Sequence, residues 1–442
     1  MTTRAGTRYN TGDSGGLREE PVSLTDSLLL QPYRVLDLTD DKGFLCGRIL
    51  ADFGADVIKV EPPGGDPSRR FGPFYHDIPD PEKSLLWFAY NANKRGITLD
   101  IRSRDGQALF KELLGKADFV IESFPPGYMD SIGLGYEALS QVNPAIILTS
   151  ITPFGHTGPW RDYKGTDIVL WALSSYMYVE GDEDRPPVRF GAPQSYLNAA
   201  LEAAVGTLTA HHHRQLTGEG QWVDVSAQQA SIIVNLQNQQ YWDLARFNPR
   251  RAGPCIYRYG VAWSHQRRIW ACKDGFICFI LMAGATGAPG NEALTAWMEE
   301  EGLAPECMKH MDWTAYNIRA DEITVEDYAE ITEALTAFFG RHTKGELYRE
   351  AIGRRIPLFP CSTVEDLRQD DHLSARAFWT EVEHPELGDT LTYPRPCMLL
   401  SESLCQIRRR APLIGEHNRE VLGEELGLST EDLLALAQAG VI

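Results

Sequence analysis

The acidic run Glu180-Gly-Asp-Glu-Asp-Arg-Pro-Pro187 is the first segment whose residue types could carry out chemistry. It places several carboxylates in a turn-rich stretch that follows a segment rich in aromatic residues. A carboxylate held in such a turn can serve as a nucleophile or a general base, so Asp182, Glu183 and Asp184 are all candidates. A charge run of this kind is more commonly a solvated loop, and these residues alone do not select one of the three.

Three basic residues form a second group that could carry chemistry. Lys94, Arg95 and Arg102 fall within one short stretch of a chain that has 42 Lys and Arg against 61 Asp and Glu, a formal net charge of −19. We interpret the cluster as a phosphate-binding site, because loops that follow parallel strands bind ligands in α/β sheets. The alternative interpretation is a solvated edge.

Composition and charge exclude several functional classes. The acidic balance would repel both a phosphate backbone and an anionic membrane surface, so we expect neither nucleic acid nor membrane as a partner. There is no GxxxxGK, HExxH or GxSxG motif, and no GxGxxG follows the first predicted strand. The eight cysteines form no CxxC pair, which favours reduced thiols in a cytoplasmic protein over disulfides or a zinc site, and we therefore expect no metal.

Strands that alternate with helices must position these residues. Short apolar strands are predicted at 34–38, 56–61, 96–100, 118–122 and 145–150, with helices between them at 44–53, 103–117 and 136–141. Strands separated by helices of this length predict a parallel sheet covered on both faces. Long helices are expected at 196–215 and 226–247, with a strand at 221–225 between them, and a final helix is expected from Ser429 or Thr430 with Asp432 completing a capping pair.

Changes in composition along the sequence also predict how the chain divides into lobes. We expect a flexible N-terminal tail at 1–32, the first part of a large α/β lobe at 33–248, a small lobe at 249–362 and a return to the large lobe at 363–442. The loop 284–290, rich in glycine, is interpreted as a plain connection. The longest apolar runs are too short, or too interrupted by glycine and proline, to span a bilayer.

Several segments, which occur in the same order from about residue 33 onward, together resemble the family III CoA-transferases. This family includes formyl-CoA:oxalate and carnitine CoA-transferases and shares its fold with α-methylacyl-CoA racemase. The matching segments are 34–38, 50–66, 93–100, 143–144, 218–225 and 415–423. The resemblance implies a Rossmann-like parallel sheet in a large lobe, a smaller α+β lobe, and two chains interlocked as rings, either as a homodimer or with a homologous subunit.

The resemblance also selects site residues. The family's catalytic aspartate precedes a Gly-Pro-Pro-like stretch, and that register falls on Asp184, with Asp182 as the alternative if the turn is shifted. The implied coenzyme A positions come after the third and fourth strands: Leu99, Asp100, Ile101 and Arg102, then Ser123, Phe124 and Pro125. In this arrangement Arg102 would hold phosphate and adenine would lie by the second group.

The implied activity is transfer of CoA from an acyl-CoA donor, with succinyl-CoA as a candidate, to a free carboxylic acid. The expected route is an aspartyl-acyl anhydride followed by an aspartyl-CoA thioester, without metal or redox cofactor. The alternatives are an acyl-CoA racemase or isomerase of the same fold and a non-catalytic subunit of a heteromeric transferase. The racemase is disfavoured because Thr166 stands where a racemase has histidine before Asp167.

The sequence departs from the family pattern in two places. An acidic stretch, 40–44, replaces the usual amide-containing segment after the first strand. The mobile glycine loop of the family corresponds to 258–265 and here contains one glycine. The bulkier segment at 258–265 implies an acid other than oxalate, and the aromatic residues near the expected site indicate an acid larger than formate or oxalate.

Overall fold

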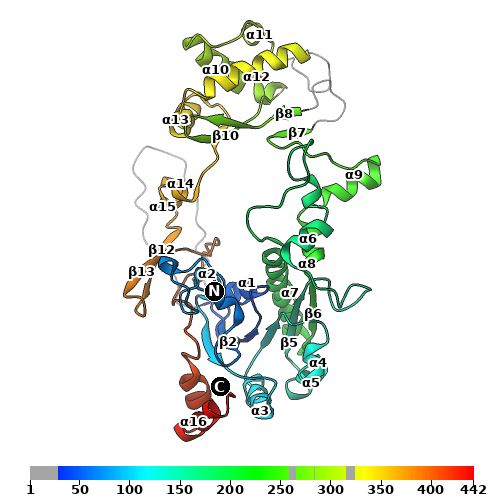
Figure 1. Ribbon diagram of the computed structural model, residues 1–442, viewed down its shortest axis with the longest axis vertical. Coiled ribbons are helices and arrows are strands. Elements are labelled where there is room, and N and C mark those ends of the chain that lie inside the picture. The colour runs from blue at the N-terminus through cyan, green and yellow to red at the C-terminus, as the bar shows by residue number, and fades with distance from the viewer. Residues whose placement is uncertain (1–27, 258–264, 283, 315–323) are drawn as a thin grey trace, which may run out of the picture.

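The computed structural model describes residues 28–257, 265–282, 284–314 and 324–442. Figure 1 shows an elongated molecule, with a sheet-based lobe at the bottom and a second, mostly helical lobe at the top. The chain crosses to the upper lobe after α9 and returns before α14. The hydrophobic core of the upper lobe is built from residues between Trp270 and Leu358, and we propose boundaries for this lobe at 249 and 362.

A six-stranded sheet forms the centre of the lower lobe. Its order is β3-β2-β1-β4-β5-β6 and every neighbouring pair is parallel, which confirms the predicted α/β class. The strands from β2 to β5 are almost entirely buried, because helices cover both faces of the sheet. Their bounds are β1 Arg34–Leu38, β2 Asp56–Glu61, β3 Arg95–Thr98, β4 Phe119–Glu122, β5 Ile147–Thr152 and β6 Trp222–Ser226.

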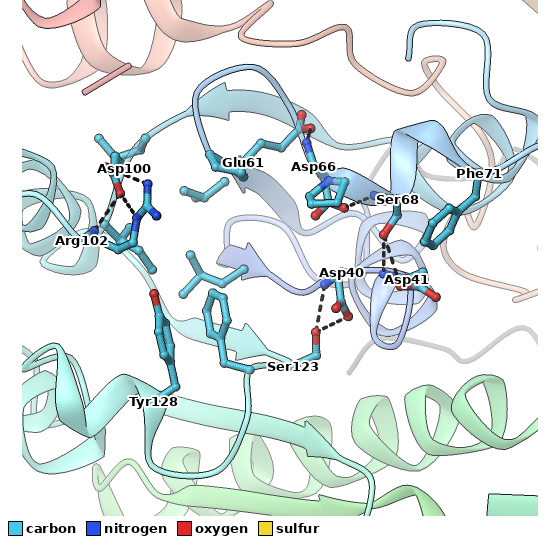
Figure 2. A pocket seen from close by; sticks show the side chains of 17 residues that line it. Asp40, Asp41, Glu61, Asp66, Ser68, Phe71, Asp100, Arg102, Ser123 and Tyr128 are labelled. Carbon is cyan, nitrogen blue, oxygen red and sulfur yellow. Dashed lines mark hydrogen bonds and ion pairs between the residues drawn. The ribbon is translucent and has the colours of Figure 1, made fainter. Parts of the chain in front are cut away.

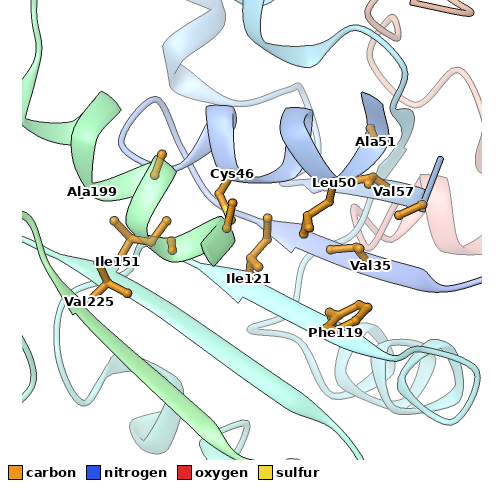
Figure 3. Close-up of a cluster of buried hydrophobic side chains, with 14 of the residues drawn as sticks. Val35, Cys46, Leu50, Ala51, Val57, Phe119, Ile121, Ile151, Ala199 and Val225 are labelled. Carbon is orange, nitrogen blue, oxygen red and sulfur yellow. The ribbon is translucent and has the colours of Figure 1, made fainter. Parts of the chain in front are cut away.

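One face of the sheet is covered by α1 (Phe44–Asp52) and the long α7 (Ser195–Thr217). Figure 3 shows Cys46 and Leu50 of α1 above Val35 and Ile121 of the sheet, with Ala199 of α7 nearby. Ala199, Ala200, Ala203, Ala204 and Ala210 of α7 are each at most 3% exposed. Their small side chains allow α7 to approach α1 closely. The other face packs against α3 (Arg104–Leu114) and α5 (Tyr136–Val142).

Shorter elements complete the two lobes. In the lower lobe these are η1 Pro67–Arg70, η2 Tyr75–Asp77, α2 Leu85–Asn91, α4 Tyr128–Ser131, α6 Asp167–Leu173, η3 Met177–Val179, α8 Ala227–Ile233 and α9 Gln237–Ala245. The chain then forms the pair β7 Cys255–Tyr257 and β8 His265–Arg267. The upper lobe has an antiparallel sheet, β9 Ile269–Cys272, β10 Gly275–Phe279 and β11 Leu358–Pro360, with α10 Gly284–Glu300, α11 Glu306–Lys309, α12 Val325–Phe339 and α13 Lys344–Arg354.

The returning chain packs again on the lower lobe. It forms α14 Val364–Arg368, α15 Asp371–Ala375, the hairpin β12 Trp379–His384 and β13 Asp389–Pro394, the π-helix η4 Arg419–Glu425 and α16 Thr430–Gln438. The hairpin packs against Phe44, Trp87 and Phe88. Oγ of Ser429 accepts the backbone N–H of Asp432, and the Asp432 carboxylate accepts the backbone N–H of Ser429, so the predicted capping pair begins α16.

Residues of the returning chain also close the edge of the sheet at β3. The backbone N–H of Gly96 donates to Nδ1 of His417 at 3.1 Å, and that of Thr98 donates to Oδ1 of Asn418 at 2.9 Å. An edge strand otherwise presents a row of unpaired backbone groups. The side chains of His417 and Asn418 therefore satisfy the edge that the sheet itself leaves open.

Because Nδ1 accepts this bond, His417 must stay neutral for the edge to hold. Burial lowers the pKa of His417, against the opposing effect of Glu416 and Glu420. A histidine with a lowered pKa contributes stability that is complete above about pH 6.5 and is lost as the pH falls through its folded value. Asparagine cannot take up a proton. We therefore expect the free energy of unfolding of His417→Asn, measured by urea titration, to fall less between pH 7 and 5 than that of the unmodified protein. Parallel profiles for the two proteins would contradict this.

Three expectations need correction. The predicted helix at 226–247 is broken into α8 and α9, because the β-branched run Ile232-Ile-Val234 and Asn235 weaken helix propensity at that point. The stretch 284–290 is the first part of α10 rather than a loop, and Gly287 and Gly290 allow close contact with Met282 and Pro357. Residues 28–32 are not part of a flexible tail, since Leu30 is buried in the main core.

Candidate active site

A cavity of about 370 Å³ opens at the carboxyl ends of β1, β2, β3 and β4. In this sheet β2 and β4 flank β1 on opposite sides, so the order in which strands are added to the sheet reverses at β1. Ligands of open α/β sheets bind at such a switch point. Figure 2 shows Asp100, Arg102 and Tyr128 at one end of the cavity and Asp41, Ser68 and Phe71 at the other.

Six of the seven predicted coenzyme A positions line this cavity: Leu99, Asp100, Ile101, Arg102, Ser123 and Phe124. They come together because they follow β3 and β4, whose carboxyl ends meet at one edge of the sheet. Pro125 faces instead a smaller cavity of about 200 Å³ on the other side of the loop after β4. This loop therefore contributes to two cavities.

The outer end of the cavity combines a guanidinium group with two aromatic rings. The side chain of Arg102 is 68% exposed and its Nε donates to Asp100 at 2.7 Å, a bond that raises the pKa of Arg102. The rings of Phe124 and Tyr128 lie with centroids 4.8 Å apart. A guanidinium beside aromatic rings can bind a phosphorylated purine. Sequence reasoning missed Tyr128, although it follows the turn at Gly127 in the same loop.

Arg102→Ala should weaken binding of coenzyme A by roughly tenfold, because a phosphate would lose its charge-assisted donor. Isothermal titration with CoA measures this directly. Arg104→Ala is the matched control, since Arg104 is an exposed arginine of α3 outside the cavity lining and should leave affinity unchanged. Equal affinities for the Arg102 variant and the unmodified protein would return Arg102 to the solvated-edge interpretation.

The predicted phosphate-binding cluster is wrong for its other two members. Lys94 is fully buried, and its Nζ contacts Oδ2 of Asp37 at 2.7 Å. Burial lowers the pKa of Lys94 to about 8, whereas Asp37 opposes that shift. Arg95 is 6% exposed and pairs with Asp56 and with Glu420 and Glu425 of η4. Both cations are thus occupied in holding the sheet together.

The inner end of the cavity is acidic. Oγ of Ser123 donates to Oδ1 of Asp40 at 2.7 Å, and the backbone N–H of Asp40 donates back to that Oγ. Oγ of Ser68 donates to Asp41, and burial of the Asp41 carboxyl together with the nearby Asp40 raises the pKa of Asp41. Lys42 pairs with Asp40. The acidic stretch that departs from the family pattern thus forms this end of the cavity.

A buried ion pair fixes the wall that carries Ser68 and Phe71. Arg69 is 1% exposed, and its Nε and Nη2 donate to the two carboxylate oxygens of Glu61 at 2.6 and 2.8 Å. Its guanidinium also lies 3.6 Å from the centroid of the Trp87 ring. The pair ties η1 to the end of β2, and so it sets the shape of the cavity on this side.

A second cavity of about 520 Å³ shares Asp41 with the first. Its lining is mostly apolar and includes Leu86, Tyr90, Tyr196 and Leu197. Asp167 also lies there, but its Oδ1 accepts the backbone N–H groups of Gln194 and Ser195 at 2.9 Å each. Asp167 therefore caps the start of α7.

Asp184 lies on an exposed turn and lines neither cavity. The turn is held by contacts with the segment that leads to β7, where Arg251 donates to the backbone oxygen of Asp182 at 3.3 Å. The segment that follows the Asp184 turn reaches Ala192 and Pro193, which line the second cavity. Of the segment that corresponds to the family's glycine loop, 258–265, residues 258–264 lie outside the described residues.

Comparison with known proteins decides the family. A model of CoA-transferase family III matches residues 30–418. The chain belongs to this family. This CoA-transferase is 36% identical over 395 residues to the succinyl-CoA:(R)-benzylsuccinate CoA-transferase subunit BbsE of Thauera aromatica, a match that covers 89% of this chain and 93% of the relative.

Two further matches support the assignment. The CoA-transferase is 33% identical to the succinyl-CoA–D-citramalate CoA-transferase of Chloroflexus aurantiacus, over 93% of this chain and 97% of that one. It superimposes on the crystal structure of a CAIB/BAIF family protein from Brucella suis with a TM-score of 0.77 and 27% identity, covering 89% of this chain and 98% of that one. An acyl-CoA and an organic acid are therefore its substrates.

Within the described ranges, no group of three or more His, Cys, Asp or Glu side chains is placed to hold a metal ion. In the same part of the chain, no helix combines the length and the apolar character needed to cross a membrane.

Proposed function

We propose that this CoA-transferase moves CoA from succinyl-CoA to a carboxylic acid larger than oxalate. The observation that carries the proposal is the cavity at the switch point, which gathers a guanidinium and aromatic rings at one end and adjoins a larger apolar cavity at the other. Two relatives whose names include succinyl-CoA support the choice of donor.

The proposed ligand extends along both cavities. The nucleotide end of CoA lies by Arg102, Phe124 and Tyr128. The thioester end passes Asp41 into the second cavity, toward the wall at Ala192 and Pro193, which belongs to the segment that follows Asp184. The acid occupies the second cavity, whose volume of about 520 Å³ and apolar walls suit an acid with a bulky apolar body. This division gives each end of an elongated substrate its own chemistry.

We assign the transfer chemistry to Asp184. Its carboxylate attacks the thioester carbonyl of the donor, forming a mixed anhydride and releasing the CoA thiolate. The thiolate then attacks the aspartyl carbonyl, which yields an aspartyl-CoA thioester and the free donor acid. The acceptor carboxylate repeats the two exchanges in reverse, so no external base is needed.

Such a nucleophile must lose its hydration, which an exposed turn does not by itself provide. Apolar side chains around the turn are about half exposed: Tyr178 48%, Val188 49% and Phe190 48%. We propose that a second subunit, identical or homologous, covers this surface and completes the site. That one relative is named as a subunit supports a multi-chain enzyme.

The test is to incubate the purified protein with succinyl-CoA and a panel of acids, and to detect new thioesters by mass spectrometry. The panel pairs small acids such as oxalate with dicarboxylic acids that carry an apolar or aromatic substituent, which we expect to be preferred. Exchange of the α-hydrogen of a branched acyl-CoA in heavy water, without any new thioester, would favour the racemase instead. Transfer restricted to oxalate or formate would contradict the proposed acid class.

A further inference from the structure

The loop after β4 separates the candidate CoA cavity from the smaller cavity of about 200 Å³. Ser123, Phe124 and Tyr128 face the CoA cavity, whereas Glu122 and Pro125 face the smaller one. Figure 2 shows Ser123 and Tyr128 on one wall of the CoA cavity. Because both sides belong to one short loop, a structural change on the side of the smaller cavity can shift the residues that face the CoA cavity.

Glu122 is the group on the far side that holds the loop. Its side chain is 2% exposed, and one oxygen, Oε2, accepts the backbone N–H of Phe124 at 2.6 Å. A bond from a backbone N–H to an ionised carboxylate is shorter and stronger than a bond between neutral groups. The ionised state of Glu122 thus fixes the backbone at Phe124, whose ring lies at a tilt against that of Tyr128.

The other oxygen of Glu122 faces a second partner. Its Oε1 lies 4.0 Å from Nε2 of His156, and this buried nitrogen has no hydrogen-bond partner. The imidazole is held in place by its edge-on contact with Trp222, at 4.8 Å between centroids, and by the bond from the His156 backbone N–H to Asp224. A protonated Glu122 would meet an acceptor after a shift of about 1 Å.

The electrostatics of the pair set the pH range in which it responds. Burial raises the pKa of Glu122 to about 7, an effect that Asp224 and Asp40 add to and that hydrogen bonds from Ser150 and Phe124 oppose. Burial lowers the pKa of His156, while Asp224 and Asp130 act to raise it and Arg161 to lower it. A proton taken up near neutral pH therefore resides on Glu122 and leaves the imidazole neutral.

We propose that Glu122 is a positioning residue whose carboxyl group holds Phe124 when ionised and turns to His156 when protonated, so that the affinity of the enzyme for acyl-CoA depends on pH. This inference rests on the proposed function, because it places acyl-CoA in the cavity that Phe124 lines. It concerns binding rather than chemistry, since Glu122 does not touch the candidate nucleophile. The expected signature is a change in KM with kcat unaltered.

The test compares the protein with Glu122→Gln between pH 6 and 8. Glutamine is a neutral mimic of the protonated carboxyl group and cannot ionise. We expect the KM for succinyl-CoA to rise about fivefold toward pH 6 in the unmodified enzyme and to stay flat in the variant, with the dissociation constant of CoA from calorimetry following the same pattern. Glu137→Gln is the matched control, because Glu137 lines the same small cavity but is exposed. The KM of this variant should depend on pH as that of the unmodified enzyme does.

A second measurement follows the pair without any substrate. The imidazole signal of His156, assigned in NMR spectra by its loss in His156→Gln, should shift near neutral pH in the unmodified protein and lose that step in Glu122→Gln. A pH-dependent KM that persists in Glu122→Gln, or a His156 signal that ignores the substitution, would overturn the inference. CoA binding that is measurable but independent of pH would overturn it alone, whereas absence of CoA binding at every pH would overturn the proposed function as well.

Discussion

Asp184→Asn should abolish CoA transfer, with turnover reduced by at least about 10³-fold, because an amide cannot form the mixed anhydride that begins the exchange. The affinity for CoA should remain nearly unchanged, since Asp184 lines neither cavity. The measurement is steady-state transfer from succinyl-CoA to the best acid of the panel, together with calorimetric titration of CoA. Loss of both turnover and affinity would indicate a structural role.

Asp182→Asn is the matched control, because Asp182 is an acid on the same turn and is the alternative nucleophile. Asp182 lies 3.9 Å from Arg185, and its backbone accepts from Arg251, so it has a structural role that the variant largely keeps. Trapping the enzyme with acyl-CoA and hydroxylamine, followed by peptide mass analysis, should modify Asp184 alone. Modification at Asp182 would correct the register, and a fully active Asp184→Asn enzyme without modification would end the covalent mechanism.

Arg69→Met should lower the free energy of unfolding by about 3–5 kcal/mol, because it leaves the Glu61 carboxylate buried without its cation. The side chains of this pair are 1% and 0% exposed. Methionine can make neither of the two parallel bonds that the guanidinium donates to Glu61. Urea unfolding followed by circular dichroism measures the loss, and η1 with its cavity-lining Ser68 should loosen at the same time.

The double variant Glu61→Gln, Arg69→Met separates charge from packing. Neutralising Glu61 removes the uncompensated charge, so this variant should be more stable than Arg69→Met alone. A double variant that is less stable than the single one would show that the ionised Glu61 carboxylate stabilises the fold even without Arg69, for example as the acceptor of the Asp66 backbone N–H at 2.8 Å. The comparison requires the same buffer and temperature, because surface charges also respond to salt.

The sheet and most of the cavity could be predicted from sequence because they depend on local patterns. Strand, helix and strand follow one another along the chain, and the residues directly after β3 and β4 necessarily meet at one edge. Ser103 and Ser429 cap their helices through contacts three residues away, which a short sequence window contains. For these features a local pattern carries the necessary information.

The prediction that Lys94 and Arg95 bind phosphate was wrong because distant residues determine whether they are buried. Lys94 pairs with Asp37, and Arg95 pairs with Glu425, which is 330 residues away in the chain. A sequence window around β3 contains neither partner, so both cations resemble free charges there. Pro125 was placed with the other CoA positions because it follows β4 directly, but the loop after β4 faces two cavities and Pro125 lines the smaller one.

Closure of the β3 edge by His417 and Asn418 has a consequence for how the protein is made. The paired residues are 321 and 320 positions apart, and a ribosome that adds about 5–20 residues per second needs on the order of 15–60 s to cover that interval. Throughout this time the nascent sheet carries an unsatisfied outer strand, which can pair with a neighbouring chain. Slower translation should therefore increase aggregation rather than relieve it, and chaperones that shield strand edges should matter most during synthesis.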